Sequence, residues 1–208
     1  MTKELIVFSG LIREIAKVKS FQNSLLTIQA KYKPNIGDSI SVNGACLTVV
    51  KLDKNSFSVE LSPESENILA TENYQNEVHI EPAMQMGDRF EGHIVQGHID
   101  IIGTIKKVEK FGNSYNIFIL IGTKSSHLII PKGSISVDGV SLTINDISDE
   151  VVRLTIIPHT MENTIFRNYK IGTRVNIETD MFARYIDNIL ANRKKTSWND
   201  FDSIMAKY

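Results

Sequence analysis

The fold is decided by a ten-residue stretch, Ser134-Ile135-Ser136-Val137-Asp138-Gly139-Val140-Ser141-Leu142-Thr143, which the chain contains in two versions. The other version, Ser39-Ile40-Ser41-Val42-Asn43-Gly44-Ala45-Cys46-Leu47-Thr48, lies 95 residues earlier (134 − 39). Seven of the ten positions are identical, and the differing pairs are Asn43/Asp138, Ala45/Val140 and Cys46/Ser141. Ungapped similarity of this kind indicates an internal duplication rather than two coincidental strand–turn–strand segments.

The duplication extends outward from these two stretches. The further matched pairs are Pro63/Pro158, each opening a short polar stretch with helical potential, Val78-His79-Ile80-Glu81/Val175-Asn176-Ile177-Glu178, and Gly10/Gly97. Their offsets differ slightly, so loops have changed length around a common core. We therefore expect two small domains, residues 1–91 and 92–180, followed by a separate C-terminal segment, residues 181–208.

Composition excludes several classes of protein. The 208 residues include 23 basic and 24 acidic side chains, a net charge of −1 that gives no electrostatic case for nucleic acid or an anionic membrane. The single Cys46 excludes an intramolecular disulfide and a cysteine-cluster zinc site, and it is consistent with a cytoplasmic protein. No apolar run approaches the ~18 residues of a membrane span, and the N-terminus lacks a signal-peptide pattern.

Most of the chain predicts short β-strands. Apolar and polar residues alternate in segments such as Leu26-Thr27-Ile28-Gln29 and Phe57-Ser58-Val59-Glu60-Leu61. Asn43-Gly44 and its counterpart Asp138-Gly139 predict tight hairpins, because these residues tolerate positive φ. Many short strands with turn residues between them indicate an all-β fold, either a sandwich or a closed barrel, and a barrel leaves no exposed sheet edge.

The C-terminal segment has a different period. Phe182, Tyr185, Ile186, Ile189 and Leu190 recur at helical spacing after Thr179 or Asp180, either of which can act as the N-cap. The first half has no counterpart of this helix, which packs either on its own barrel or against copies of itself. Residues 198–208 are predicted to be either a further short helix or a tail.

Two histidines and one serine are candidate chemical groups. His93 and His98 are five residues apart in a Gly-interrupted segment, which does not match a zinc-binding helix, so no metal site is expected. A hydrogen-bonding role is the first interpretation of His93, whereas site and structural roles are balanced for His98. The stretch around Ser141 resembles a nucleophile elbow but lacks its closing glycine and its α/β context, which disfavours a hydrolase.

The twin positions Cys46 and Ser141 have two interpretations. Either they are small residues inside packed barrels, or each belongs to a polar rim around a pocket. The rims would consist of Ser41, Cys46 and Thr48 in the first half and Ser136, Ser141 and Thr143 in the second. Two such pockets would suit two related neutral heterocycles that carry a polyol.

At these residues the chain closely resembles the riboflavin synthase family of the alpha-chain type over nearly its full length. The motifs that carry the resemblance are Phe8-Ser9-Gly10-Leu11-Ile12, Ser41-Val42-Asn43-Gly44-Ala45-Cys46-Leu47-Thr48, Gly92-His93-Ile94-Val95-Gln96-Gly97-His98, Lys132-Gly133-Ser134 through Ser141-Leu142-Thr143, Ile157-Pro158, and Asn176-Ile177-Glu178-Thr179-Asp180. Each motif alone is weak, whereas the set is highly specific.

The resemblance implies a fold and a reaction. The fold is two tandem six-stranded Greek-key barrels with a C-terminal helix that joins three chains into a homotrimer. The reaction is dismutation of two molecules of 6,7-dimethyl-8-ribityllumazine, by transfer of a four-carbon unit, to riboflavin and 5-amino-6-(D-ribitylamino)uracil. No cofactor takes part, each site lies between the first barrel of one chain and the second barrel of a neighbour, and lumazine synthase is a further candidate partner.

The same motif matches imply which residues form the site. Those matched to catalytic positions are Phe8, Ser41, Cys46, His98, Ser141, Thr143 and Asp180. The first barrel would contact its ligand through Gly10, Leu11, Ile12, Cys46, Leu47, Thr48, Glu60, Leu61, Ser62, Pro63, Glu64 and Ser65. The second would use Gly97, His98, Ile99, Lys132, Ser141, Leu142, Thr143, Ile156, Ile157, Pro158, His159, Thr160 and Met161.

Chemical roles for these residues are a hypothesis. His98, with Thr143 or Ser41, would assist removal of a proton from the 7-methyl group of one lumazine. Ser141, Cys46 or a bound water would be the nucleophile that activates the other. Holding both substrates in register would supply effective molarity.

The chain departs from the family pattern in four places. Seven residues precede Phe8, where the family has Met alone, Ser9 replaces Thr, His159 replaces an acid, and the turn at Asn43-Gly44 is shorter than in some members.

Two rival functions fit related folds. Lumazine proteins hold one lumazine or flavin without catalysis, and one of their halves tends to lose its site residues, whereas both rims are intact here. A flavin-binding reductase would need a nucleotide-binding domain after its barrel, and only a short helical segment follows Asp180.

Overall fold

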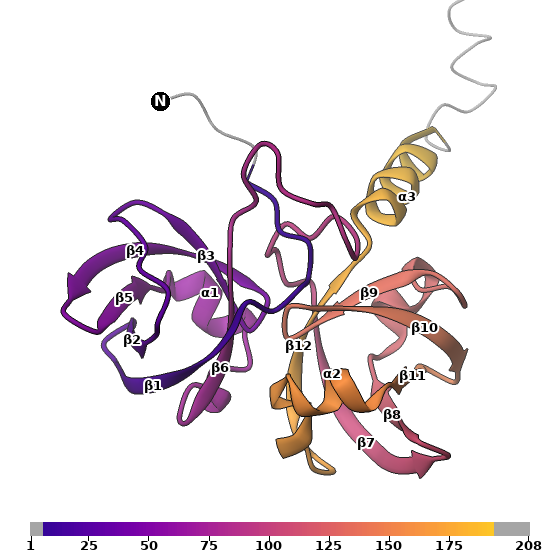
Figure 1. Ribbon diagram of the computed structural model, residues 1–208. Helices are drawn as coiled ribbons and strands as arrows, with labels where there is room; N and C mark the ends of the chain where they lie inside the picture. The colour runs from indigo at the N-terminus through magenta and orange to yellow at the C-terminus, as the bar shows by residue number, and fades with distance from the viewer. Residues whose placement is uncertain (1–5, 194–208) are drawn as a thin grey trace, which may run out of the picture.

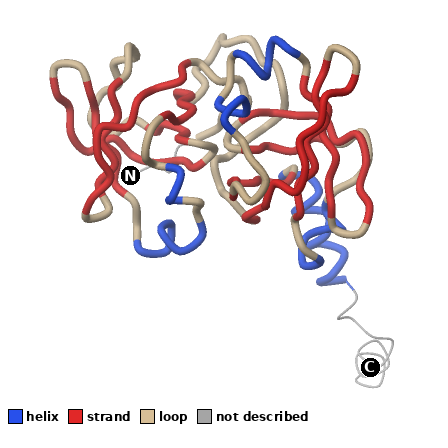
Figure 2. The backbone as a smooth tube through the Cα atoms, turned by 90° about the horizontal axis from the view of Figure 1, so that it is seen from below, coloured by secondary structure: helices blue, strands red, loops and turns tan. Residues whose placement is uncertain are grey.

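The structure is a computed structural model that describes residues 6–193. Figures 1 and 2 show two β-barrels side by side and a helix, α3, that projects away from both. The residues before Ile6 and the expected helix or tail at 198–208 lie outside the described part. The expectation of an all-β fold with two barrels and a C-terminal helix is confirmed.

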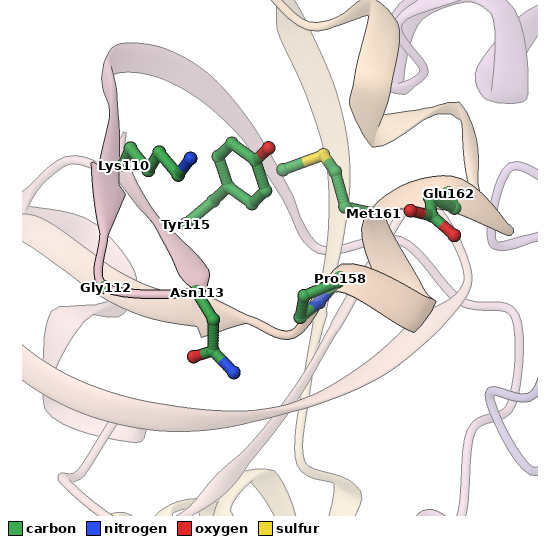
Figure 3. Close-up of a pocket in the computed structure, with 7 residues that line it drawn as sticks. All are labelled: Lys110, Gly112, Asn113, Tyr115, Pro158, Met161 and Glu162. Carbon is green, nitrogen blue, oxygen red and sulfur yellow. The ribbon is translucent and has the colours of Figure 1, made fainter.

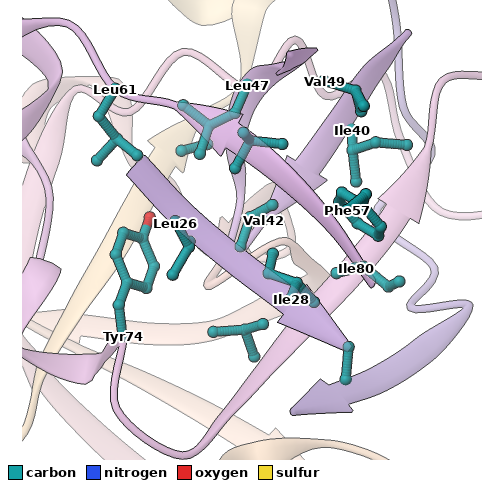
Figure 4. Close-up of a cluster of buried hydrophobic side chains, with 14 of the residues drawn as sticks. Leu26, Ile28, Ile40, Val42, Leu47, Val49, Phe57, Leu61, Tyr74 and Ile80 are labelled. Atoms are coloured by element: carbon teal, nitrogen blue, oxygen red, sulfur yellow. The ribbon is translucent and has the colours of Figure 1, made fainter. Parts of the chain in front are cut away.

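The first barrel closes in the strand order β1-β2-β5-β4-β3-β6, and all its pairings are antiparallel. Its strands are β1 (Glu14–Gln22), β2 (Leu25–Gln29), β3 (Ser39–Val42), β4 (Ala45–Asp53), β5 (Ser56–Glu60) and β6 (Glu77–Pro82). The alternation predicted for β2 is observed, because Leu26 and Ile28 are fully buried. Figure 4 shows these two side chains pointing into the barrel with Phe57, Ile80 and Tyr74, where they form one continuous core.

The second barrel repeats the same circular order with β7 to β12 in place of β1 to β6. Its strands are β7 (Ile101–Phe111), β8 (Ser114–Leu120), β9 (Ser134–Val137), β10 (Val140–Ser148), β11 (Val151–Ile156) and β12 (Arg174–Thr179). Even the β-bulges recur, since the bulges at Val18/Ser20 and Val49/Lys51 match those at Ile105/Lys107 and Ile144/Asp146. Bulges bend a strand, so their repetition gives both halves the curvature that closes a barrel.

The two decapeptides form the hairpins β3–β4 and β9–β10, whose turns meet between the barrels. Asn43 and Gly44 have φ of 44° and 83°, and Asp138 and Gly139 have 43° and 83°, as the sequence predicts. A Cβ added to Gly44 would lie 2.8 Å from the Gly139 backbone nitrogen, and one added to Gly139 would lie 2.9 Å from the Gly44 nitrogen. These glycines are therefore required by close approach as well as by φ, and the two turns mark a pseudo-two-fold axis.

Short helices cover the barrel ends. As expected, Pro63 and Pro158 open the first two α-helices, and the Ser62 hydroxyl caps the first by accepting from the Ser65 backbone N–H at 3.1 Å. The short helical segments are α1 (Pro63–Ile68), η1 (Thr71–Asn73), η2 (Thr123–Leu128), α2 (Pro158–Glu162) and η3 (Ile165–Asn168). Pro is tolerated at these first positions because its missing N–H would have no helical partner there.

Helix α3 (Met181–Arg193) is capped by Asp180, whose Oδ1 accepts from the Phe182 N–H at 2.8 Å. Thr179, the alternative cap, instead donates its hydroxyl to Asp100 at 2.6 Å. The predicted apolar stripe of α3 does not pack on the barrel of its own chain. Its five members stay more than half exposed: Phe182, Tyr185, Ile186, Ile189 and Leu190. Within residues 6–193, no helix has the length and apolar character needed to cross a membrane.

Candidate functional site

Two buried glutamates each hold a backbone segment that runs between the barrels. Glu81, on β6, accepts from the Ser9 N–H at 2.7 Å, the Ser9 hydroxyl at 2.8 Å and the Gly10 N–H at 3.1 Å. Its twin Glu178, on β12, accepts from the N–H groups of residues 96, 97 and 98 at 2.9, 2.8 and 3.1 Å. Burial raises the pKa of both carboxyls, and these donors oppose that rise by stabilising the charged form.

Each held segment then crosses to the other barrel. The Gly10 carbonyl accepts from the Ser141 N–H of the second barrel at 2.8 Å, and the Gly97 carbonyl accepts from the Cys46 N–H of the first at 2.9 Å. Contact is close enough that a Cβ on Gly10 would lie 2.6 Å from the Ser141 Cβ. A Cβ on Gly97 would likewise lie 2.5 Å from the Cys46 Cβ. The two segments are thus exchanged between the halves.

This exchange carries each glycine segment to the half opposite the one expected from the sequence. Residues 10–12 were assigned to the first barrel, but Ile12 packs on the hydrophobic core of the second. Residues 97–99 were assigned to the second barrel, but Ile99 belongs to the core of the first. The physical reason is the pair of backbone hydrogen bonds to Ser141 and Cys46, which the sequence repeat does not encode locally.

In the first barrel the candidate residues converge around β4 and the start of α1. Cys46 is half-buried, and burial raises the pKa of its thiol, while hydrogen bonding by Ser39 opposes the rise. Thr48 is exposed and lies opposite Glu60 on the neighbouring strand, with Ser62, Pro63 and Glu64 following at the surface. Leu61 and Leu47, by contrast, are buried in the core.

In the second barrel the corresponding surface lies on β10 and the end of β11. Ser141 is half-buried, Thr143 is exposed, and Leu142 packs against the second core. Lys132, Ile157 and His159 are exposed, Pro158 and Thr160 are half-buried, and Ile156 and Met161 are buried. The rims at Cys46 and Ser141 are thus matched in position but differ in chemistry.

The two histidines differ in exposure and in contacts, and His93 has the hydrogen-bonding role expected for it. His93 is only 8% exposed, and its Nδ1 lies 2.7 Å from the Ser141 Oγ. His98 is exposed, and its backbone N–H binds Glu178, so it follows Gly97 to the Cys46 side. The local sequence did not identify Ser141 as the partner of His93, because the contact depends on the packing of Gly92 against Ser141.

Three residues matched to catalytic positions have structural contacts. Phe8 is fully buried and pairs with Val95 across the barrels, with N–H to carbonyl distances of 2.7 and 3.0 Å. Ser41 is 2% exposed, and its Oγ would lie 3.5 Å from a Cβ on Gly139. Asp180 caps α3, and its carboxylate also acts electrostatically on His93. Asp180 therefore connects His93 to the helix.

A surface pocket of about 550 Å³ lies between the β7–β8 hairpin and α2 of the second barrel. Figure 3 shows Lys110 and Tyr115 on one side of it and Pro158, Met161 and Glu162 on the other. Pro158 and Met161 are among the expected ligand contacts, whereas Lys110, Asn113, Tyr115 and Glu162 were not singled out from the sequence. Apolar side chains with a few polar groups suit an amphipathic small molecule.

Arg184 connects α3 to Glu178, which holds one of the exchanged segments. The Arg184 guanidinium donates to the Glu178 Oε1 at 3.0 Å and to the Gln96 Oε1 at 3.1 Å, and it lies 3.6 Å from an Asp100 oxygen. The first half lacks this arrangement because it has no counterpart of α3. From the sequence, Glu81 and Glu178 are recognised only as equivalent positions of the internal repeat. That equivalence was the one signal of their common role.

Metal ligation finds no support in the described part of the chain. Residues 6–193 contain no group of three His, Cys, Asp or Glu side chains placed to hold a metal ion. The two rims bring together backbone amides, hydroxyls, one thiol and histidines, and the buried carboxylates of Glu81 and Glu178 hold the exchanged segments.

Comparison with known proteins gives the class first. The sequence profile described as "Lumazine binding domain" matches residues 9–83 and 96–180, one match for each barrel. Solved structures of LumP, with riboflavin and with 6,7-dimethyl-8-(1'-D-ribityl) lumazine, superpose with TM-scores of 0.74 and 0.71. Each covers 83% of this chain and 98% of its own, but identity is only 20–21%, so these structures support the fold alone. The chain is a tandem lumazine-binding-domain protein.

Sequence relatives then give the family. The chain is 37% identical to the riboflavin synthase of Bacillus subtilis, with 91% of this chain and 94% of the relative covered. It is 36% identical to that of Bacillus amyloliquefaciens over 93% and 94%, and 43% identical to that of Photobacterium phosphoreum over 74% and 72%. The chain belongs to the riboflavin synthase family of enzymes.

Proposed function

We propose that this protein converts two molecules of 6,7-dimethyl-8-ribityllumazine into riboflavin and 5-amino-6-(D-ribitylamino)uracil. The observation that carries the proposal is the pair of rims at Cys46 and Ser141, each backed by the exchanged glycine segment of the other half. Two copies of one substrate need two similar pockets. The products together contain the atoms of the two substrates, so the four-carbon transfer needs no external oxidant, reductant or cofactor.

We assign the roles within this reaction by side of the site. On the first-barrel side, His98 stands with Cys46 and assists removal of a proton from the 7-methyl group of one lumazine. On the second-barrel side, Ser141 or a water that it binds is the nucleophile that activates the other lumazine. The Cys46 thiol, whose pKa is raised by burial, stays protonated at neutral pH and acts as a polar contact.

We also propose that the site is completed by a second chain in a homotrimer. The exposed stripe of α3 supports this, because residues 6–193 leave five large apolar side chains of one helix more than half exposed. Contacts through this stripe would place the first barrel of one chain against the second barrel of a neighbour. Sedimentation equilibrium of the purified protein tests the assembly, since a monomer at micromolar concentration would exclude it.

The remaining features of the proposal concern context. We propose domain limits at residues 1–91 and 92–180 with 181–208 as the assembly segment, a cytoplasmic location, and lumazine synthase as a candidate partner. Ligand contact by the sequence-matched residues remains part of this proposal, with residues 10–12 now on the second-barrel side and 97–99 on the first.

The deciding experiment mixes the purified protein with the ribityllumazine and no added cofactor. We expect riboflavin, followed at its long-wavelength absorbance, in half the molar amount of lumazine consumed. Tight fluorescent binding without product would instead support the alternative, a non-catalytic lumazine or flavin antenna. Retention of polar residues on both rims favours the enzyme over that alternative.

A further inference from the structure

The contact between His93 and Ser141 is enforced by the surrounding backbone. The His93 N–H donates to the Ser9 carbonyl at 3.2 Å, and the Ser141 N–H donates to the Gly10 carbonyl at 2.8 Å. Gly92 has a φ of +78°, and a Cβ there would lie 3.1 Å from the Ser141 Oγ and would overlap the Ser9 carbonyl. The backbone thus fixes both partners of the 2.7 Å hydrogen bond between the His93 ring and the Ser141 hydroxyl.

The pseudo-two-fold relation shows that the first half has no histidine at the position equivalent to His93. The offset of 87 residues that relates Gly97 to Gly10 also relates His93 to Ile6 (93 − 87). Ile6 has no polar side-chain atom and lines a different surface pocket, beside Ser39. The position equivalent to His93 on the Cys46 side is thus apolar, so the halves differ in this particular contact.

The charge state of His93 is set by its surroundings. Burial lowers the pKa of the ring, and the Asp180 carboxylate, the charged group that acts on it in the described structure, opposes the shift. A ring with a lowered pKa is neutral at pH 7 and keeps one nitrogen free to accept a hydrogen bond.

We propose that His93 is the positioning residue of the second rim: its Nδ1 accepts the hydrogen bond of the Ser141 hydroxyl and fixes where the serine oxygen points. The inference rests on the proposed function and deepens it, because it makes the Ser141 side the one with an oriented, electron-rich oxygen. On the Cys46 side, Ile6 occupies the position equivalent to His93, and burial raises the pKa of the thiol. Duplication supplied two equal rims, and the His93/Ile6 difference makes them unequal.

Four variants test this role through activity. His93→Leu removes the acceptor, and we expect turnover to fall about tenfold to a hundredfold. His93→Asn places an amide oxygen near the Nδ1 position, so it should restore most of the turnover and remove the loss of activity that protonation of His93 causes at acidic pH. If His93 acts through Ser141, then adding His93→Leu to Ser141→Ala should change turnover by less than about twofold.

Two outcomes of these assays would overturn the proposal. One is an equal loss from His93→Leu in the wild-type and Ser141→Ala backgrounds. The other is a His93→Asn enzyme as slow as His93→Leu, with the wild-type pH profile. Thermal unfolding of each variant shows whether a loss of activity follows from a loss of fold.

Nitrogen-15 NMR of the imidazole gives a readout that is independent of turnover. We expect His93 in the ligand-free protein to be the neutral tautomer with hydrogen on Nε2, and its Nδ1 signal to shift in Ser141→Ala. A hydrogen found on Nδ1 would refute the proposal even in an active enzyme. Absence of riboflavin formation by the wild type would refute the proposed function and leave the NMR result to decide the hydrogen bond by itself.

Discussion

His79 donates a hydrogen bond from Nδ1 to the backbone carbonyl of Asp138 at 2.7 Å, across the interface between the two barrels. The direction follows from the other ring nitrogen, because the His79 Nε2 accepts from the Ile165 N–H at 2.8 Å. The pseudo-two-fold relation repeats the arrangement with an amide: the Asn176 side chain donates to the Asn43 carbonyl at 2.9 Å and accepts from the Ala70 N–H at 2.8 Å. At each of these two pairs of equivalent positions, one half carries a titratable side chain, His79 or Asp138, where the other half carries a neutral amide, Asn176 or Asn43.

Replacing Asp138 by Asn should remove a pH-dependent cost of folding. Burial raises the pKa of Asp138 to about 7, although Tyr169 donates its hydroxyl to this carboxyl. The folded state then binds the proton more tightly than the unfolded state, so the Asp138 contribution to stability falls as pH rises from about 4 to about 7. We expect the difference in unfolding free energy, Asp138→Asn minus wild type, to grow over this range by a few kcal/mol (about 1.4 kcal/mol per pKa unit).

Urea unfolding at a series of pH values measures this difference. The substitution is structurally conservative because Asn43 already occupies the equivalent position in the first half, where its Oδ1 accepts from the His79 N–H at 2.8 Å. A difference that stayed constant from pH 4 to 8 would show that Asp138 does not titrate within this range in the folded protein.

Replacing His79 by Asn should have the opposite pH dependence. Burial lowers the pKa of His79 to about 4, so its contribution to stability is present above pH ~6.5 and is lost as pH falls through about 4. His79→Asn reproduces Asn176 of the other half, at the cost of the edge-to-face contact between His79 and Phe166. We expect the variant to lose less stability than wild type on acidification, as measured by urea unfolding. Parallel curves of unfolding free energy against pH for the two proteins would contradict this prediction.

The sequence predicted the barrels because their determinants are local and repeated. Alternation placed Leu26 and Ile28 inside, and Asn43-Gly44 and Asp138-Gly139 supplied the turn geometry. The local sequence does not show whether a glycine segment packs against its own barrel or against the other one. The offset of 87 residues between the two segments is the same in both arrangements. The roles of Glu81 and Glu178 were missed for the same reason: a buried carboxylate is defined by the donors that reach it from distant parts of the chain.

The exchanged segments give a prediction about glycine. Gly10→Ala combines a positive φ of +77° with a Cβ only 2.6 Å from the Ser141 Cβ, whereas Gly37→Ala has the positive φ (+92°) without any atom within 4 Å of its Cβ. Backbone strain of about 1 kcal/mol should appear in both variants. We expect a further loss of stability, and of turnover, only in Gly10→Ala, as measured by thermal unfolding and riboflavin formation. Equal behaviour of the two variants would mean that the contact with Ser141 is dispensable.

Arg184 gives a prediction about how α3 communicates with the first rim. Its guanidinium lies against Glu178, the carboxylate that holds residues 96–98 and, through Gly97, the Cys46 N–H. Because Arg184 counteracts the raised pKa of Glu178, Arg184→Met should raise that pKa further, so protonation would release the segment at a higher pH than in wild type. We expect lumazine affinity, measured by fluorescence titration, to fall at a higher pH in this variant than in wild type on acidification.

Arg174→Met, which breaks only an exposed pair with Glu72, is the matched control. It should cost less than about 1 kcal/mol of stability and leave lumazine binding unchanged. If lumazine affinity has the same pH dependence in the Arg184 variant and in this control, then α3 does not influence the first rim.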